Sequence, residues 1–336
     1  MTSSLGTWIG IEEHWVHPEL DKLLGALPAT RQDPSLALND LGDNLERLTD
    51  VGEGRIAAMD AQGVAMQILS IAPPGTQPLD GADAVPISRD INDLAAEVVQ
   101  RHPTRFRAMA TLPLADPAAA AEELRRADSL GLVGAMVYGR TGDITLDDPR
   151  FDDVFAVAAQ LQQPIFIHPQ IAPTAVRNAS YAGFDPIVEL GLATFGWGWH
   201  LEAATAALRL VVGGTLDRHP DLQLVLGHWG ELLLFWGDRV DSLSRVAGLE
   251  RRISEYFETN FHITISGMLS RALLNHVLEV TTIDRLMFST DFPFQRPTQA
   301  EIETFTLALD SDSDREKFMA GNARRLFRID ENPSGR

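Results

Sequence analysis

The segment Trp8 to Trp15 reads WIGIEEHW and begins a pattern that recurs along the chain. A short apolar run of this kind, bounded by polar residues, is typical of a buried strand. Seven further segments share the design, and stretches with helical spacing of apolar residues lie between them. The seven are Ala65–Ala72, Phe106–Leu114, Leu132–Gly139, Pro164–Gln170, Leu222–Gly230, Phe261–Gly267 and Arg285–Pro293.

Eight strands that alternate with helices predict a (β/α)8 TIM barrel in the α/β class. The length of 336 residues fits one barrel, and no interdomain linker or internal repeat divides it, so we predict a single domain over residues 1–336. A doubly wound sheet is the alternative, but no GxGxxG motif or P-loop follows the first strand. The long connections His17 to Asp50 and Ile171 to Thr194 are expected as loops over the C-terminal face, forming the walls of the active site.

The composition excludes several classes of partner. Against 28 Lys and Arg stand 47 Asp and Glu, a formal net charge of −19, so we expect neither nucleic acid nor an anionic membrane as partner. No apolar run reaches the ~18 residues of a membrane span, and the start MTSSLGTWIG lacks the features of a secretory signal. Cysteine is absent, which excludes disulfides and Cys-ligated zinc and fits a reducing compartment. A cytoplasmic location is therefore expected.

Side chains that can bind a metal ion stand at the ends of several predicted strands. Glu12 and His14 are two residues apart, so they point to the same side of the first strand. His168 ends the fifth strand and Asp291 the eighth. Each has a structural alternative, such as a buried histidine bonded to a carbonyl or an aspartate that caps a turn. Together, on one face of a barrel, the four predict a metal site.

Two imidazoles and two carboxylates suit zinc, while manganese, iron and cobalt are alternatives. Barrel hydrolases with two metal ions commonly bridge them with a carboxylated lysine from the fourth strand. The fourth segment, LVGAMVYG, has no lysine, and Lys22 and Lys317 are the only two in the chain. We therefore predict one divalent metal ion, with Zn2+ as the first choice and Mn2+ as the alternative.

His228 ends the sixth strand in the sequence GHWGELLLFWGDR. Glu231, three residues later, can sit one turn along a helix that starts after Gly230 and bond the imidazole, which raises its basicity and fixes its tautomer. This spacing predicts an acid/base role for His228, with a structural role as the alternative. Arg239 would grip a substrate carboxylate through two parallel hydrogen bonds, although a salt bridge with Asp238 or Asp241 explains it equally well.

The remaining histidines carry a weaker signal. His200 and His276 fall within helical patterns, and we expect no catalytic role for them. His262 shares a strand face with Thr264 and Ser266, where a supporting role near the metal is the expectation. No GxSxG motif occurs, which argues against a serine hydrolase.

Six motifs, in order and spanning almost the whole chain, resemble the amidohydrolase superfamily and specifically its decarboxylase branch. They are IEEHW, PIFIHP, LDRHPDLQLVLGHWGE, FHITISG, MFSTDFPF and DREKFMAGNARRLF. The branch includes decarboxylases of dihydroxybenzoates and of aminocarboxymuconate semialdehyde. E-x-H often stands in it where the hydrolases carry H-x-H, so Glu12 favours a lyase. The resemblance implies metal binding by Glu12, His14, His168 and Asp291, and a catalytic relay of His228 with Glu231.

The resemblance also bears on the substrate pocket. It implies that Arg239 contacts the substrate carboxylate and that Phe294 packs on an aromatic ring. Tyr138 and Met268 stand where close benzoate decarboxylases have asparagine, so the pocket is altered and these two residues are expected to shape it. Relatives are commonly homodimers or homotetramers, which the resemblance extends to this chain.

The reaction implied is the non-oxidative decarboxylation of a hydroxylated aromatic acid such as a dihydroxybenzoate. A proton delivered to the ring carbon that bears the carboxylate avoids an aryl anion, and we expect Asp291 to deliver it. A nearby cation lowers a carboxyl pKa, so the site must compensate. The alternative is a metal-dependent hydrolase of a lactone or amide acting through metal-activated water. A non-enzymatic metal-binding barrel is a third reading.

Overall fold

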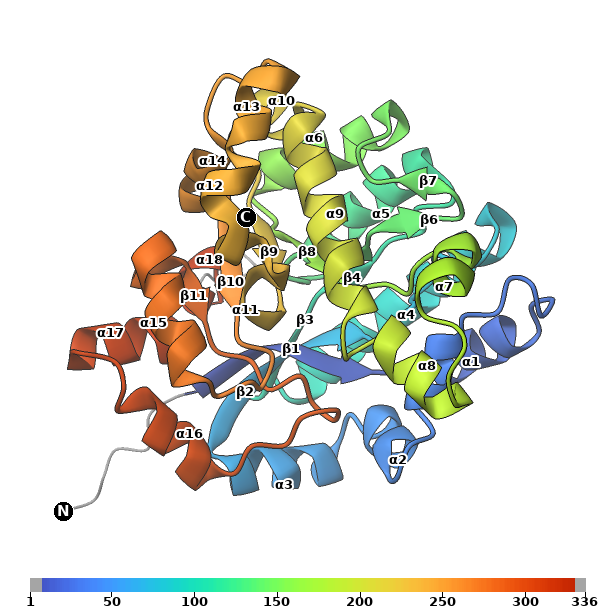
Figure 1. Ribbon diagram of the computed structural model, residues 1–336. Helices are drawn as coiled ribbons and strands as arrows, with labels where there is room; N and C mark the ends of the chain where they lie inside the picture. Colours follow the sequence, from blue (N-terminus) through green and yellow to red (C-terminus); the bar gives the residue numbers. More distant parts are fainter. Residues whose placement is uncertain (1–7, 330–336) are drawn as a thin grey trace.

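The computed structural model describes residues 8–329, so the ends of the predicted domain, residues 1–7 and 330–336, lie outside the described residues (Figure 1). Parallel strands form two sheets. The first has the order β1 (Trp8–Trp15), β2 (Val64–Ile71) and β3 (Phe106–Ala108). The second has the order β11 (Leu286–Met287), β10 (Phe261–Thr264), β9 (Leu224–Leu226), β8 (Ile165–His168), β5 (Ala135–Tyr138) and β4 (Ala110–Thr111).

The two sheets meet at both ends. Only Met109 separates β3 from β4, and its N–H donates to the Leu69 carbonyl of β2 at 2.8 Å. At the other end, Glu13 of β1 forms an isolated parallel bridge with Phe292, and the His14 N–H donates to the Phe292 carbonyl at 2.8 Å. We call this junction of β1 with residues 290–292 the seam. The strand positions therefore follow each other in chain order around one ring, as the predicted barrel requires, although no single ladder runs around it.

All eight predicted strand positions are confirmed, but most strands are shorter than the segments that predicted them. β1 keeps its predicted bounds, whereas Leu222–Gly230 yields only β9. The interior of the ring is filled by buried apolar side chains such as Ile11, Ile68 and Phe166. This packed floor leaves polar chemistry to the residues at the carboxyl ends of the strands.

Helices surround the strands (Figure 1). The longer ones are α3 (Glu53–Gln62), α4 (Gly81–Arg101), α5 (Pro117–Ser129), α6 (Asp152–Leu161), α9 (Gly198–Val212), α15 (Arg271–Val280) and α16 (Gln299–Thr306). Shorter helices are α10 (Thr215–Arg218), α11 (His228–Glu231), η3 (Leu233–Trp236), α12 (Gly237–Val240), α13 (Ser242–Ala247), α14 (Ile253–Thr259), α17 (Asp312–Glu316) and α18 (Asn322–Leu326). Single turns or bridging pieces are η1 (Pro34–Leu38), η2 (Pro149–Phe151), η4 (Ile283–Arg285), η5 (Lys317–Gly321) and the hairpin β6 (Arg140–Thr141) with β7 (Ile144–Thr145). Within residues 8–329, no helix combines the length and the apolar character that crossing a bilayer demands.

The two long connections are not plain loops, which corrects that expectation. The first carries α1 (Pro18–Gly25) and α2 (Asn44–Thr49), and the second carries α7 (Thr174–Ser180) and α8 (Pro186–Ala193). Proline in the first turn, preceded by a side chain that caps the helix, begins both α1 and α8. Such residues are recognised helix-start signals. The many Pro, Gly, Asn and Asp residues around them favoured the prediction of loops instead.

Candidate metal centre and active site

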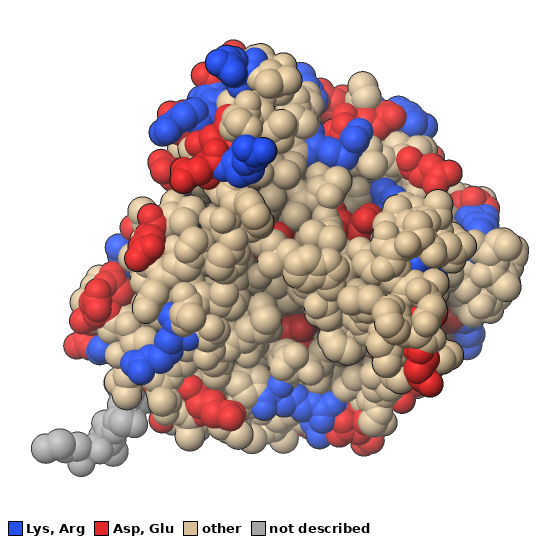
Figure 2. Space-filling view, viewed as in Figure 1, with Lys and Arg blue, Asp and Glu red and all other residues tan. Residues whose placement is uncertain are grey.

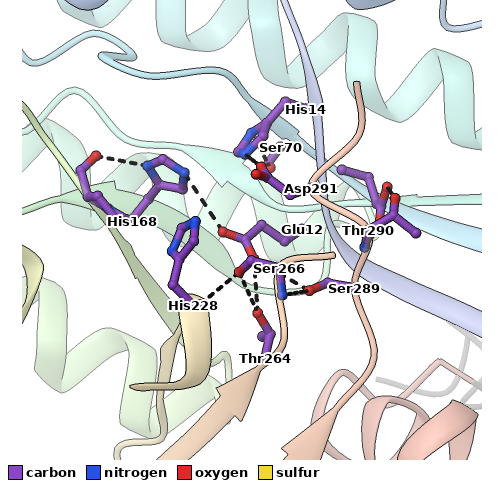
Figure 3. Close-up of polar contacts among 12 residues, drawn as sticks. Glu12, His14, Ser70, His168, His228, Thr264, Ser266, Ser289, Thr290 and Asp291 are labelled. Carbon is purple, nitrogen blue, oxygen red and sulfur yellow. Dashed lines mark hydrogen bonds and ion pairs between the residues drawn. The ribbon is translucent and has the colours of Figure 1, made fainter. Parts of the chain in front are cut away.

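Three of the four predicted ligands meet at the carboxyl ends of β1 and β8 (Figure 3). Glu12 and His14 come from β1 and His168 is the last residue of β8. One ligand atom from each lies within 4.8 Å of the others, and all three side chains are buried. Asp291 follows β11, and its Oδ1 lies 3.2 Å from His14 Nε2. The sequence-predicted ligand set is therefore brought together.

Neighbouring groups hold each ligand in a defined orientation. His168 Nδ1 lies 2.8 Å from the Pro169 carbonyl, which only accepts, so Nδ1 carries the proton and Nε2 is left to bind. Thr264 Oγ1 donates to Glu12 Oε2 at 2.9 Å, and the Ser266 hydroxyl donates to the same oxygen. Glu12 therefore keeps Oε1 for another partner. Ser266 also accepts the backbone N–H of His228 at 2.7 Å and so joins the ligand to the next part of the site.

The residues fit a bound divalent cation. Glu12 Oε1 and His14 Nε2 are buried and make no hydrogen bond among the described residues, since the 3.2 Å contact of His14 Nε2 with Asp291 Oδ1 lacks hydrogen-bond geometry. An orphaned buried polar atom costs ~1–3 kcal/mol, so two side by side indicate a missing partner. Glu12 Oε1 also lies only 3.8 Å from His168 Nε2. Carboxylate oxygen and imidazole nitrogen around one point form the mixed donor set expected for zinc or a similar ion.

Burial dominates the electrostatics of the cluster. It raises the pKa of Glu12, and it raises the pKa of Asp291 to about 7. It lowers the pKa of His14 to about 4 and that of His168 well below its usual value. The two imidazoles are therefore neutral at pH 7, as metal ligands must be. The carboxylates lack a positive neighbour strong enough to offset burial, which a cation at this point would supply.

A second group of titratable side chains lies beside the metal cluster. His228 Nδ1 and His200 Nδ1 each lie 2.7 Å from one oxygen of the buried Glu231 carboxylate. Burial alone would lower the pKa of His228, but Glu231, Glu12 and Asp291 outweigh it and raise the pKa to about 10. Burial alone would raise the pKa of Glu231, and His228 and His200 lower it instead. The 2.7 Å separations are those of charge-assisted hydrogen bonds, so the three side chains form one hydrogen-bonded group with the chemistry a proton relay needs.

The predicted contact of His228 with Glu231 is present, but the predicted helical backbone is wrong. From His228 to Leu232 every residue has a left-handed φ, between 47° and 82°. Only one of these five residues is glycine, so the turn departs from local preference. It is held by the bond from His228 to Ser266 and by Trp229 Nε1, which donates to the Met268 carbonyl at 3.0 Å.

His200 is the functional residue that sequence reasoning missed. It lies in the first turn of α9, where its helical surroundings suggested no role, and it contacts a carboxylate 31 positions away. Its Nε2 lies 3.0 Å from the Phe195 carbonyl. No spacing rule could have connected His200 to Glu231, because the link depends on how α9 packs against the turn after β9.

A cavity of about 280 Å3 opens above the ligands. Its lining residues are Leu38, Leu41, Asn44, Pro73, His168, Phe195, Trp199, His200, His228, Ser266, Met268, Asp291, Phe294 and Gln295. The volume lies near the lower limit for ligand pockets, so it suits one substituted ring rather than a larger ligand. Phe294 and Met268 line the cavity, in agreement with their predicted positions, while Trp199 and Phe195 were not foreseen.

Two predicted substrate contacts lie elsewhere. Tyr138 is buried at the end of β5, where its hydroxyl donates to the Ile71 carbonyl at 2.7 Å and its ring packs against His168, 5.6 Å between centroids. It supports the ligand and is not among the lining residues. Arg239 lies on α12 with an exposed side chain and does not line the cavity either. Within one chain Arg239 therefore does not reach this cavity, and its contact with a substrate carboxylate stays a prediction.

Comparison with known proteins agrees with this geometry. The amidohydrolase family model matches residues 14–329. γ-Resorcylate decarboxylase from a Rhizobium species is 36% identical over 339 residues, which cover 96% of this chain and 98% of that protein. The crystal structure of 5-carboxyvanillate decarboxylase from Sphingomonas paucimobilis has a TM-score of 0.87 and 32% identity, covering 96% of this chain and 99% of that one.

A third similar protein was solved with its ligands. The 5-carboxyvanillate decarboxylase from Novosphingobium aromaticivorans, in complex with manganese and 4-hydroxy-3-methoxy-5-nitrobenzoic acid, has a TM-score of 0.85 and 31% identity, covering 98% of this chain and 99% of that one. These similarities extend over nearly the whole chain, from 96% to 98% of its length. The chain therefore belongs to the amidohydrolase family, in the branch that contains the aromatic-acid decarboxylases.

Proposed function

We propose that the protein is a metal-dependent decarboxylase of a hydroxylated aromatic carboxylic acid, such as a dihydroxybenzoate. The observation that carries the proposal is the orphaned pair Glu12 Oε1 and His14 Nε2, which lies beside a proton relay in a cavity the size of one ring. A binding site alone would need the first group, whereas a proton-transfer enzyme needs both. Aromatic-acid decarboxylases among the relatives support the same chemistry.

Glu12, His14, His168 and Asp291 would hold one divalent ion. When bound, such an ion supplies the positive charge that stabilises a phenolate and a carboxylate oxygen of the substrate. Zn2+, our first choice from the donor set, stays a prediction. Mn2+ is the ion to test beside it, because a solved relative carries manganese.

Asp291 is the proposed proton donor. Burial raises the pKa of its carboxyl to about 7, which answers in part the lowering that a cation imposes. Asp291 gives its proton to the ring carbon that bears the carboxylate, and the ring is briefly dearomatised. The bond from that carbon to the carboxylate then breaks, its electron pair restores the ring, and carbon dioxide leaves. His228, protonated beside Glu231, returns a proton to Asp291.

Aromatic side chains would orient the ring during this step. Phe294 and Trp199 line the cavity, and Phe294 lies 5.8 Å from the His14 ring, between centroids. Flat apolar walls of this kind bind an aromatic ring through its faces and edges. They also exclude water, which strengthens the electrostatic interactions of the substrate anion.

Product analysis tests the proposed function. Purified protein loaded with Mn2+ or Zn2+ is incubated with a panel of hydroxybenzoates, and carbon dioxide and the aromatic product are measured. We expect stoichiometric carbon dioxide and a phenol, with one solvent deuterium on the former carboxylate carbon in D2O. Hydrolysis of lactone or amide analogues, with no carbon dioxide from any aromatic acid, would instead favour the hydrolase alternative.

We further propose a homo-oligomer of single-domain chains that works in the cytoplasm. Five exposed apolar side chains just before α8, on α8 and between α8 and α9 form what we call the apolar face: Phe184, Ile187, Val188, Phe195 and Trp197. The middle of this view of the molecule carries few charged side chains (Figure 2). A second copy of a chain with net charge −19 approaches most favourably through such a surface.

Sedimentation distinguishes the assembly states. Ile187→Glu should lower the mass from a dimer or tetramer towards the monomer. Leu307→Glu is the matched control. Leu307 is also an exposed apolar side chain, at 68% compared with 57% for Ile187, but it lies just after α16 and outside the apolar face. A monomeric wild-type chain would refute the oligomer without touching the proposed chemistry.

A further inference from the structure

Two fully buried ionisable side chains take no part in the site described so far. Glu13 is 0% exposed and Arg55 is 1% exposed. Burying a charged group is costly unless it is paired and hydrogen-bonded, so both groups need a reason to be there. Both lie behind β1, on the side away from Glu12 and His14.

Glu13 bonds directly to the segment that carries Asp291. The Thr290 N–H donates to Glu13 Oε1 at 2.8 Å, and the Thr290 hydroxyl donates to Oε2 at 2.5 Å. Asp291 itself has φ 59°, a left-handed conformation that surrounding contacts must hold in a residue with a side chain. The Glu13 carboxylate thus holds Thr290, the residue immediately before Asp291.

Arg55 bonds directly to the backbone of His14, the predicted ligand nearest to Asp291. Its Nη1 donates to the His14 carbonyl at 2.7 Å, and its guanidinium lies 4.7 Å from the centroid of the Phe292 ring. Its Nε donates to Gln67 Oε1 at 2.7 Å. Arginine has no acceptor, so this bond fixes the Gln67 amide with its nitrogen towards Glu13.

Gln67 completes the connection. Its Nε2 donates to Glu13 Oε2 at 3.0 Å. An unbroken chain of hydrogen bonds therefore runs from the His14 backbone through Arg55, Gln67 and Glu13 to the Thr290 backbone. It lies across the seam, where His14 belongs to the first strand, Asp291 follows the last, and only an isolated bridge joins the two segments.

Gly10, also in β1, leaves room for the Glu13 carboxylate because it has no side chain. A Cβ atom on Gly10 would lie 2.2 Å from Glu13 Oε1 and 2.8 Å from its Cδ. Glycine weakens the interior of a strand and often marks a close approach of another group. Here that group is Glu13, so an alanine at position 10 would displace it.

We propose that Glu13 is a positioning residue, which acts with Gln67 and Arg55 to set the distance between His14 and Asp291 across the seam. This inference rests on the proposed metal site. It assigns to the second glutamate of the IEEHW motif a role distinct from that of the first: Glu12 offers an oxygen to the ion, and Glu13 fixes where two of the other ligands stand.

Glu13→Gln tests the proposal. The amide nitrogen places a donor where Thr290 and Gln67 already donate, so at least one bond is lost. Metal-free variants are titrated with Mn2+, and free Mn2+ is followed by its electron paramagnetic resonance signal. We expect the Mn2+ affinity to fall at least tenfold and kcat at saturating Mn2+ to fall similarly, with KM changed less than threefold, because supporting bonds tune a metal site by ~10–100-fold.

Exchanging the donor and the acceptor between positions 13 and 67 should restore the hydrogen bond and with it the Mn2+ affinity. In the double variant Glu13→Gln with Gln67→Glu, residue 67 again accepts from Arg55 and residue 13 donates to it. Mn2+ affinity should return to within threefold of wild type. Glu123→Gln is the matched control, since Glu123 is also a buried carboxylate, bonded to Asn92 Nδ2 at 2.7 Å on α5, far along the chain from the ligands. It should lower the melting temperature and leave Mn2+ affinity unchanged.

The outcomes separate this inference from the proposed function. Unchanged Mn2+ affinity in Glu13→Gln, or an equal loss in Glu123→Gln, would overturn the positioning role. A wild-type chain that binds Mn2+ but releases no carbon dioxide would overturn the proposed reaction alone. If Glu13→Gln does not fold, Thr290→Val and Thr290→Ser replace it: the first should weaken Mn2+ binding threefold or more, and the second should not.

Discussion

Glu12 and Asp291 are two buried carboxylates of one site with different surroundings. Hydroxyls of Thr264 and Ser266 donate to Glu12 Oε2, and the Ser266 bond offsets part of the rise in pKa that burial causes. Among residues 8–329, no hydroxyl donates to the Asp291 side chain, and its close neighbour is His14 Nε2 at 3.2 Å. A carboxylate held by donors serves as a fixed ligand, whereas one without them can gain and lose a proton. This difference supports the proposed proton transfer by Asp291.

Asp291→Asn should retain the metal ion and lose decarboxylation. The amide oxygen can still ligate, but the side chain has no proton of suitable acidity to give, and general acid catalysis contributes ~10²–10⁴-fold. We therefore expect kcat to fall at least a hundredfold while metal content per chain, measured by elemental analysis, stays within a factor of two. Near-wild-type turnover with metal bound would remove Asp291 from the donor role.

At the scale of single residues, the sequence could reveal groups whose position follows from one strand. Alternation along WIGIEEHW put Glu12 and His14 on one side, and His168 and Asp291 stood where strands end. The strand face of Ser266 was foreseen, but its bond to Glu12 and that of His200 to Glu231 were not, because these partners lie across the barrel or on another element. The place of Arg239 outside the cavity of its own chain could not be read from the sequence for the same reason, because it depends on where the chain turns after β9.

At the scale of the element, the left-handed turn from His228 to Leu232 decides the geometry of the relay. Glu231 reaches His228 because the chain folds back at once, with no helical turn needed. Sequence reasoning foresaw the contact from the three-residue spacing but assigned the wrong backbone, since tertiary bonds to Ser266 and Met268 override local preference here. The strands were easier to predict, because period and burial coincide in each of them.

Glu231→Gln should change the pH dependence of the reaction. Glu231 is the foremost of the carboxylates that raise the pKa of His228 to about 10, so a neutral amide lowers that pKa. A group with a raised pKa is protonated below it and loses the proton as pH rises, so the active form would be lost at lower pH. The alkaline limb of kcat/KM should move down by at least about one pH unit. An unmoved limb would mean that His228 supplies no proton.

At the scale of the whole molecule, the acidity has to be reconciled with an anionic substrate. The net charge is −19, and acidic side chains lie mainly around the rim of the face in Figure 2. Charges on this rim are damped beyond a Debye length of ~10 Å at 0.1 M salt. Attraction within the cavity must then come from short range, through a bound cation and the protonated His228.

Added salt should therefore speed the encounter of the anionic substrate with the acidic protein. Between low and physiological ionic strength, screening removes the repulsion of the distant surface more than the attraction inside the buried site, so we expect kcat/KM to rise modestly, by less than about threefold. Initial-rate assays over a range of neutral-salt concentrations at constant pH measure this change in kcat/KM. A clear fall with added salt would show that local positive charge governs the approach of the substrate.

Removal and return of the metal ion tests the central claim most directly. The purified chain is stripped with a chelator, its fold is checked by circular dichroism, and carbon dioxide release from a dihydroxybenzoate is measured as Mn2+ or Zn2+ is added back. The site formed by Glu12, His14, His168 and Asp291 predicts a folded, inactive apoprotein whose activity is restored in full at one ion per chain. Undiminished carbon dioxide release from the stripped chain would contradict it.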